Sequence, residues 1–343
     1  MAKISLGLLS LIAGFGILGF VISTIGAGRI AEVFSQFSPW GFIPLIVLTV
    51  IIHIVSALKW QYLLRAMDIR ISLLPLTKMW LVGYAVSYVT PVVYIGGEIF
   101  RAYLLRERYG VPWARALSSI FIDKVVEAAV WITVIFAGAA VLISQSGTAS
   151  ISRYIAISLA SILFFACFLV VVYIFSFRKK SLVHFWFAKV LKSQNSPTGK
   201  FLQDIEKDFF SFFSSGNRAH ILGVTRLALI KYFLLLVRNI FLFYYLVGAL
   251  SISASIIALG FSYLSFTVPT PAAIGVQEGL LSLVLQRVGF EAGIGTVFTL
   301  LLRGAEIIMV GFGLYFLMRW GLGKFAFRIT KWARGGLGSE NVI

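Results

Sequence analysis

Long apolar runs, separated by short polar stretches, make up most of this chain. Each run is long enough to cross a hydrocarbon core about 30 Å thick as an α-helix, a form in which the backbone satisfies its own hydrogen bonds. Aromatic and basic residues follow several of the runs, as is typical at a membrane interface. The pattern predicts about six spanning helices: Ile4–Ile25, Trp40–Leu64, Trp113–Ser144, Tyr154–Phe177, Ile221–Leu250 and Gly295–Met318.

Two further apolar runs are interrupted. Leu73–Val89 leads into a break between Pro91 and Gly97. Ser253–Val268 leads into a second break, at Pro269–Pro271, and the apolar pattern resumes at Gly275. A broken helix at membrane depth is tolerated only where its exposed backbone is buried in protein or lines a wet cavity. We therefore predict two re-entrant broken-helix hairpins, with a single spanning helix as the alternative for the first.

The two breaks belong to a longer internal repeat. Thr90–Glu98 (TPVVYIGGE) and Thr270–Glu278 (TPAAIGVQE) share their Thr-Pro start and their final Glu at one constant displacement along the chain. Charged positions recur at nearly the same displacement: Lys59 with Arg238, Lys124 with Arg303, and Glu127 with Glu306. We predict a single transmembrane domain, residues 1–343, built from two repeats at about 40–145 and 220–320, with 178–218 as a linker.

Basic residues predict which side each segment faces, because cytoplasmic loops collect lysine and arginine. Basic clusters flank the first hairpin, which should open to the cytoplasm, and none flanks the second, which should open outside. The halves are then inverted-topology repeats. Both termini and residues 178–218 should be cytoplasmic, and Gly28–Ser38 should form an external loop. Leu182–Leu191 is either a helix on the membrane surface or part of a solvated linker.

Composition indicates an all-α polytopic membrane protein, because 59% of the residues are hydrophobic and the mean hydropathy is +0.95. The formal charge of +17 then points to anionic lipid headgroups and not to nucleic acid. The single cysteine, Cys167, can form no internal disulfide, and His53, His184 and His220 lack metal-ligand spacing. We expect no metal and no cofactor, and the sequence has no nucleotide-binding motif that would indicate ATP hydrolysis.

Charges inside apolar helices are candidates for function, because an unpaired ion in the membrane is costly. We predict a central cavity in which four basic side chains bind a phosphate: Lys59, Lys124, Arg238 and Arg303. Four carboxylates would balance charge or relay protons: Glu98, Glu127, Glu278 and Glu306. The helix breaks that shape this cavity lie at Pro91, Gly96, Gly97, Pro269, Pro271 and Gly275. The half-helices behind them would present N–H groups and positive dipole ends to an anion.

A structural role for the same charges is the alternative. Two base-acid pairs have the i, i+3 spacing that allows pairing within one helix: Lys124 with Glu127, and Arg303 with Glu306. Two other carboxylates would then cap the half-helices: Glu98 and Glu278.

Three arginines after the first break, Arg101, Arg106 and Arg108, are predicted to set topology and contact headgroups outside the site. Asp123, next to Lys124, is either a further charge partner or an interfacial residue.

Three stretches carry a resemblance to a known family: Gly96–Leu105 (GGEIFRAYLL), Ser118–Glu127 (SSIFIDKVVE) and Pro269–Ile308, which contains PTPAAIGVQEGLLSLVL and LLRGAEII. The chain resembles the lysylphosphatidylglycerol synthase transmembrane-region family, whose members include the flippase half of the multiple peptide resistance factor. That factor also carries a soluble aminoacyl-transferase domain, for which even the longest polar segment here, 178–218, is too short. The resemblance implies translocation of a polar or phosphorylated lipid without its synthesis.

The family usually has Glu-Arg where this chain has Asp123-Lys124, and a more glycine-rich version of Pro271 to Val276. Charge is kept at position 124, but the bidentate phosphate recognition of an arginine is absent there.

The leading hypothesis is an inner-membrane lipid flippase or transporter, without enzymatic activity, for an aminoacylated phospholipid, a phospholipid or a polyprenyl-phosphate-linked lipid. The alternatives are a membrane-embedded lipid-modifying transferase or phosphatase, and a non-transporting scaffold for a lipid or glycan enzyme. A homo-oligomer and a separate lipid-synthesising enzyme are open as partners, and nucleic acid is not expected.

Overall fold

The computed structural model of the chain describes residues 18–20, 22–89, 96–146, 197–213, 218–268 and 270–320, together with a few isolated positions. All regular elements in this part of the chain are helical, as predicted. Four helical segments are long and apolar enough to cross a membrane: Pro39–Ala66, Trp113–Ser146, Arg218–Val247 and Ile294–Arg319. The bent pair Leu18–Ile25 and Ala27–Ser35, with an angle of 83°, gives a fifth if it forms one span. The predicted span Tyr154–Phe177 lies outside the described helices.

The helices begin and end close to the predicted boundaries, because each fills one apolar run. The spanning helices are α3 (Phe42–Ala66), α6 (Trp113–Ser146), α10 (Arg218–Val247) and α13 (Ile294–Arg319). A short 3-10 turn, η1 (Pro39–Gly41), precedes α3. Lys59 and Trp60, two turns before the end of α3, are 0% exposed and so are buried in protein, whereas Arg65 in the last turn of the helix is exposed.

Both interrupted runs form helix pairs. The first consists of α4 (Leu73–Val89) and α5 (Gly96–Tyr109), and the second of α11 (Ile252–Ser265), η4 (Pro271–Ala273) and α12 (Val276–Arg287). Gly97 packs so closely on the Gly83 carbonyl of α4 that a Cβ would overlap it, which explains a glycine at the start of α5. Gly275 is the N-cap of α12. Pro91 and Pro269 lie outside the described residues.

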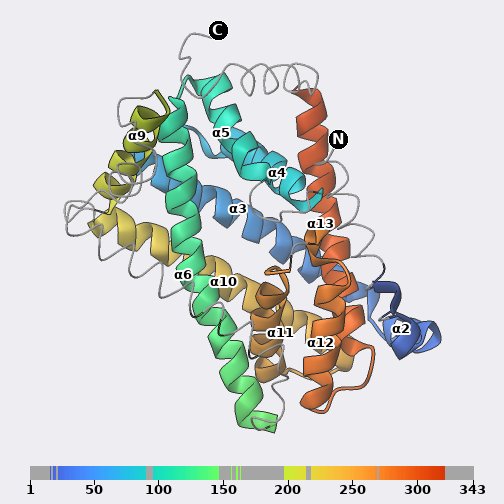
Figure 1. Cartoon of the computed structure of the whole chain (residues 1–343). Coiled ribbons are helices and arrows are strands. Elements are labelled where there is room, and N and C mark those ends of the chain that lie inside the picture. Colours follow the sequence, from blue (N-terminus) through green and yellow to red (C-terminus); the bar gives the residue numbers. More distant parts are fainter. Residues whose placement is uncertain are drawn as a thin grey trace.

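The two pairs approach the centre of the bundle from opposite ends (Figure 1), and η4 lies against α4. In the same view α6 and α13, the helices that follow the two pairs, run in opposite directions. The packing is exchanged between the halves: α4 packs against α13, α11 packs against α6, and α3 packs against α10. Each hairpin therefore completes its packing on the last helix of the other half.

Glycines make these two crossings close. A Cβ at Gly260 of α11 would meet the Val134 carbonyl of α6, and a Cβ at Gly313 of α13 would meet the Leu81 carbonyl of α4. The displacement from position 81 to position 260 equals that from position 134 to position 313. Leu81 and Gly260 are therefore matched positions of the repeat, and so are Val134 and Gly313. The same two repeat positions therefore touch at both crossings. The glycine comes from the hairpin helix α11 at one crossing and from the spanning helix α13 at the other.

Two predicted connectors contain helices. The expected external loop at Gly28–Ser38 is mostly α2 (Ala27–Ser35), whose Val33 is buried against the core while Arg29 bonds Glu291 at 2.6 Å. Within the predicted linker 178–218 lies α9 (Pro197–Phe212), which packs on α6. Their polar residues suggested loops, but one apolar face of each helix is sufficient to anchor it to the bundle. Leu182–Leu191 lies outside the described residues.

The second break holds strained backbone. Ala272 and Ala273 have φ values of 48° and 54°, in the left-handed region that costs an L-residue about 1–2 kcal/mol. Both side chains are buried, at 3% and 0% exposure, so the surrounding protein imposes this conformation.

Replacing Ala272 with glycine is expected to raise the free energy of unfolding by about 0.5–1 kcal/mol, because the relief of strain exceeds the added entropy of a glycine. Reversible unfolding of the detergent-solubilised protein measures the change. The matched control is Ala258→Gly in the interior of α11, which should instead destabilise by about 1 kcal/mol. A destabilised Ala272→Gly protein would show that the strain is not relieved by removing the methyl group.

Candidate functional site

One cavity of about 190 Å³ lies where the helix breaks and the charged helices meet. Side chains from α3, α4, α5, α6, α10, α11, α12 and α13 line it. Six of the eight candidate binding residues are among them: Glu98, Lys124, Glu127, Arg238, Arg303 and Glu306. Lys59 and Glu278 are 0% exposed and lie behind this lining, each bonded to a lining residue.

The base-acid pairs within α6 and α13 do not form as expected. Lys124 pairs with Glu98 of α5 at 2.6 Å, and Arg303 pairs with Glu278 of α12 at 2.5 Å. Residues at i and i+3 lie about 60° apart around a helix, so the base and the acid of each pair face different neighbouring helices. Each base therefore bonds the carboxylate in the first turn of the second helix of its own hairpin, α5 or α12.

The acids of the two pairs bond the preceding spanning helix instead. Glu127 bonds Lys59 of α3 at 2.8 Å, and Glu306 bonds Arg238 of α10 at 2.6 Å. Both kinds of contact occur once in each half, between positions that the internal repeat aligns. The matched sequence positions thus make matched contacts in space.

The first half extends its pair into a buried network. Arg101 is 1% exposed, its guanidinium lies 4.0 and 4.3 Å from the ring centroids of Trp60 and Trp80, and it bonds Glu98 and Asp123. Asp123 also bonds Lys59, at 2.8 Å. The prediction that Arg101 contacts headgroups outside the site is therefore wrong, because α5 turns this side chain inward between two tryptophans, and Asp123 is a charge partner.

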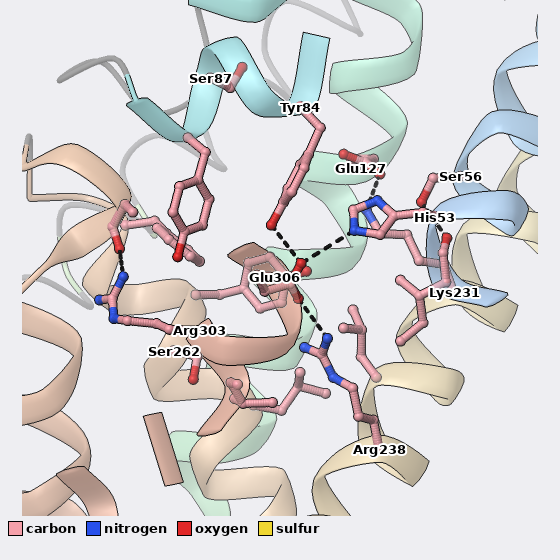
Figure 2. Close-up of a pocket in the computed structure, with 18 of the residues that line it drawn as sticks. His53, Ser56, Tyr84, Ser87, Glu127, Lys231, Arg238, Ser262, Arg303 and Glu306 are labelled. Atoms are coloured by element: carbon pink, nitrogen blue, oxygen red, sulfur yellow. Dashed lines mark hydrogen bonds and ion pairs between the residues drawn. The ribbon is translucent and has the colours of Figure 1, made fainter. Parts of the chain in front are cut away.

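In the second half, three side chains converge on Glu306 (Figure 2). Tyr84 donates to Oε2 at 2.6 Å, Arg238 donates to Oε1 at 2.6 Å, and His53 Nε2 lies 3.3 Å from Oε2. Tyr84 and His53 come from the first half of the chain. Glu306 therefore joins the two repeats, as Glu127 does through Lys231 of α10 at 2.5 Å.

Sequence reasoning did not identify Tyr84, His53 or Lys231 as site residues. Tyr84 has a counterpart, Tyr263, at the same displacement as the charged positions, and both tyrosines line the cavity. A search for matched polar residues of every kind would have found this pair. No such signal marks His53, whose counterpart is Tyr232, or Lys231, whose counterpart is Ile52.

The pair Glu278–Arg303 also holds the second break together. Glu278 accepts a hydrogen bond from the backbone N–H of Gly275 at 2.8 Å, and Arg303 donates to the Ala272 carbonyl at 2.8 Å. The carboxylate thus occupies the N-terminus of α12, where an external anion was expected, and it serves as the cap that the alternative interpretation anticipated.

The charges in and directly behind the cavity are slightly unbalanced. Six are basic: Lys59, Arg101, Lys124, Lys231, Arg238 and Arg303. Five are acidic: Glu98, Asp123, Glu127, Glu278 and Glu306. With a neutral His53, this cluster of described residues has one excess positive charge. In the same part of the chain, no three His, Cys, Asp or Glu side chains are arranged to hold a metal ion.

Residues 7–313 match the family model described as the lysylphosphatidylglycerol synthase transmembrane region. The chain belongs to this family. A UPF0104 membrane protein of Methanocaldococcus jannaschii is 23% identical over 322 residues, which cover 90% of this chain and 92% of that protein. A UPF0104 membrane protein of Methanothermobacter thermautotrophicus is 30% identical over 118 residues, which cover 34% of this chain and 35% of that protein. No solved structure shows significant similarity to the chain.

Membership of the lysylphosphatidylglycerol synthase transmembrane family confirms the resemblance seen in the sequence and, with the apolar helices, makes this a membrane protein. The matched region ends at position 313 and so includes every residue of the charged cavity.

Proposed function

We propose that this protein is a flippase or transporter that moves a phosphate-bearing polar lipid across the plasma membrane. The observation that carries the proposal is a cavity inside an apolar helix bundle, lined by charges and with one excess positive charge. A cavity of this kind lowers the cost of bringing an anionic headgroup to membrane depth, because fixed cations replace part of its hydration.

Two lining cations are best placed to meet the headgroup. Arg238 uses Nη1 to bond Thr49 and Glu306, and its buried Nε has no hydrogen-bond partner among the described residues. Lys124 is the most exposed cation of the cluster, with 27% of its side chain accessible. They come from different halves, so a phosphate between them would be held by both repeats. An arginine fork and a lysine point charge are both established phosphate ligands.

We propose that the other charged residues of the cluster hold Arg238 and Lys124 in position. Arg303 donates to Glu278 through Nε and Nη2 and to the Ala272 carbonyl through Nη1, and Lys59 is buried with two carboxylates. We assign both to the supporting structure of the site, although the sequence pattern grouped them with the phosphate ligands.

The architecture supports alternating exposure of the cavity. We propose that the two hairpins are re-entrant from opposite faces of the membrane and that the halves are inverted repeats, which suits a rocking motion of one half against the other. Basic residues near the helix ends place both termini in the cytoplasm under this proposal. The family's link to lysylphosphatidylglycerol favours a phospholipid or an aminoacylated phospholipid as cargo.

Purified protein in liposomes should accelerate leaflet exchange of fluorescent phosphatidylglycerol, phosphatidylcholine or a polyprenyl phosphate, followed by quenching from outside. Arg238→Gln is expected to slow exchange by about tenfold or more, because a charge-assisted hydrogen bond is worth about 1.5–3 kcal/mol.

The matched control is Arg319→Gln, at the exposed end of α13, which should exchange lipid like the unmodified protein. Melting temperatures of both variants establish that they fold. Absence of protein-dependent exchange for all three lipids would reject the proposed function.

A further inference from the structure

His53 is the described histidine that lines the cavity, and its surroundings define its state. The ring is 6% exposed and packs edge-on against Tyr84, with ring centroids 4.5 Å apart. His220, the other described histidine, lies at the start of α10 against Tyr62. An imidazole ring is either neutral or cationic, so uptake of a proton by His53 would add one positive charge to the cavity.

The partners of His53 identify its neutral tautomer. Trp80 Nε1 can only donate, and it lies 3.4 Å from Nδ1, so Nδ1 is the unprotonated acceptor. Nε2 then carries the hydrogen and donates to Glu306 at 3.3 Å. Both contacts are longer than a usual hydrogen bond, so the neutral form is held weakly.

Protonation of Nδ1 would rearrange these contacts. The new N–H would face the Trp80 N–H, so that hydrogen bond would be lost. The ring would become a cation beside Glu306, which would then have two cationic partners, His53 and Arg238. The two cations bond different oxygens of Glu306, and a protonated His53 would neutralise the carboxylate without Arg238. Arg238 lines the cavity, and its buried Nε has no hydrogen-bond partner among the described residues.

The charged and titratable groups around His53 come from four neighbouring helices. Trp80 and Tyr84 of α4 and Glu306 of α13 contact the His53 ring directly. Arg238 of α10 bonds the other oxygen of Glu306. Figure 2 shows Glu127 of α6 and Lys231 of α10 bonded to each other, so this lysine already has a carboxylate partner. The equivalent of His53 in the second half is Tyr232, so only one half contains the titratable ring.

We propose that His53 couples lipid transport to protons: a proton taken up at Nδ1 turns His53 into the counter-ion of Glu306 and releases Arg238 to bind the anionic headgroup. The cavity gains one positive charge in this step, and return of the proton to solvent restores the Arg238–Glu306 pair. Because such coupling is reciprocal, a bound anionic headgroup favours the protonated ring. This inference rests on the proposed transport function and adds its regulation.

Exchange of phosphatidylglycerol by the reconstituted protein should be at least about fivefold faster at about pH 5.5 than at about pH 8, with a smaller change for zwitterionic phosphatidylcholine. His53→Gln, whose amide can keep both neutral contacts, should abolish the difference, and His220→Gln should keep it. Exchange without pH dependence, or pH dependence that survives His53→Gln, overturns the inference and leaves the proposed function standing.

A binding measurement tests the coupling without transport. In detergent micelles, the ¹⁵N signals of labelled histidine, assigned to His53 by their loss in His53→Gln, should show Nδ1 gaining a proton on acidification. Short-chain phosphatidylglycerol should move that transition to higher pH in the unmodified protein and not in Arg238→Gln. A ring that keeps its neutral tautomer down to about pH 5, or a transition that does not respond to the lipid, overturns the inference even if no exchange is detected.

Discussion

Replacement of Arg303 with alanine is expected to lower the free energy of unfolding by about 3–5 kcal/mol. The reason is that Glu278, which is 0% exposed, loses its cationic partner while it remains in the protein interior. The Ala272 carbonyl loses a donor in the same change, so the strained turn at the second break loses support from α13. Reversible unfolding in mixed micelles measures the difference.

A double variant separates charge burial from loss of packing. Glu278→Leu combined with Arg303→Met removes both charges and keeps most of the volume, and it should recover more than half of the lost stability. Arg319→Ala is the matched control and should change stability by less than about 0.5 kcal/mol. If Arg303→Ala has normal stability but no longer exchanges lipid, Arg303 is a substrate ligand and does not have the structural role assigned to it here.

Replacement of Lys59 with alanine is expected to destabilise the protein by about 3 kcal/mol or more. Lys59 is 0% exposed and bonds two carboxylates, Asp123 and Glu127, at 2.8 Å each. After the change, Asp123 retains among the described residues only the contacts of Arg101 Nη1 and Nη2, both at 3.4 Å, and Glu127 retains Lys231. The loss should appear in the same unfolding measurement.

Lys231→Ala provides the comparison, because Lys231 bonds one of the same carboxylates but is 12% exposed at the cavity. It should cost about 1–2 kcal/mol, since Glu127 keeps Lys59. Equal losses for the two variants would contradict the conclusion that Lys59 supports both acids.

The helices and the breaks were predictable because each rests on a local signal. A spanning helix needs a long apolar run, and the described boundaries of α4 and α6 begin at the predicted residues, Leu73 and Trp113. The candidate charges were also predictable as a set. Ions are rare inside apolar helices, so the few that occur must meet protein or water, and six of the eight line one cavity.

The pairing of those charges could not be predicted from spacing alone. Lys124 and Glu127 are close along α6, but which neighbouring helix each side chain faces depends on how α3, α5 and α10 pack around it. The sequence does not state that arrangement.

Arg101 was misplaced for a related reason. It lies in a run of basic residues with Arg106 and Arg108, and only the position of Trp60 and Trp80 shows that its side chain turns inward. His53 was considered only as a metal ligand, and its contact with Glu306 links residues 253 positions apart.

The exchanged packing of the hairpins has a consequence for how such a chain can have arisen. Because α4 packs most extensively on α13 and α11 on α6, a polypeptide with only one repeat would leave its hairpin without the helix that makes its largest contact. In the inverted-repeat architecture proposed above, two identical copies could supply what each lacks only if they were inserted into the membrane upside down relative to one another. Fusion of two such copies in one gene would fix that antiparallel partnership and would free each half to diverge, for example to a histidine at position 53 and a tyrosine at position 232.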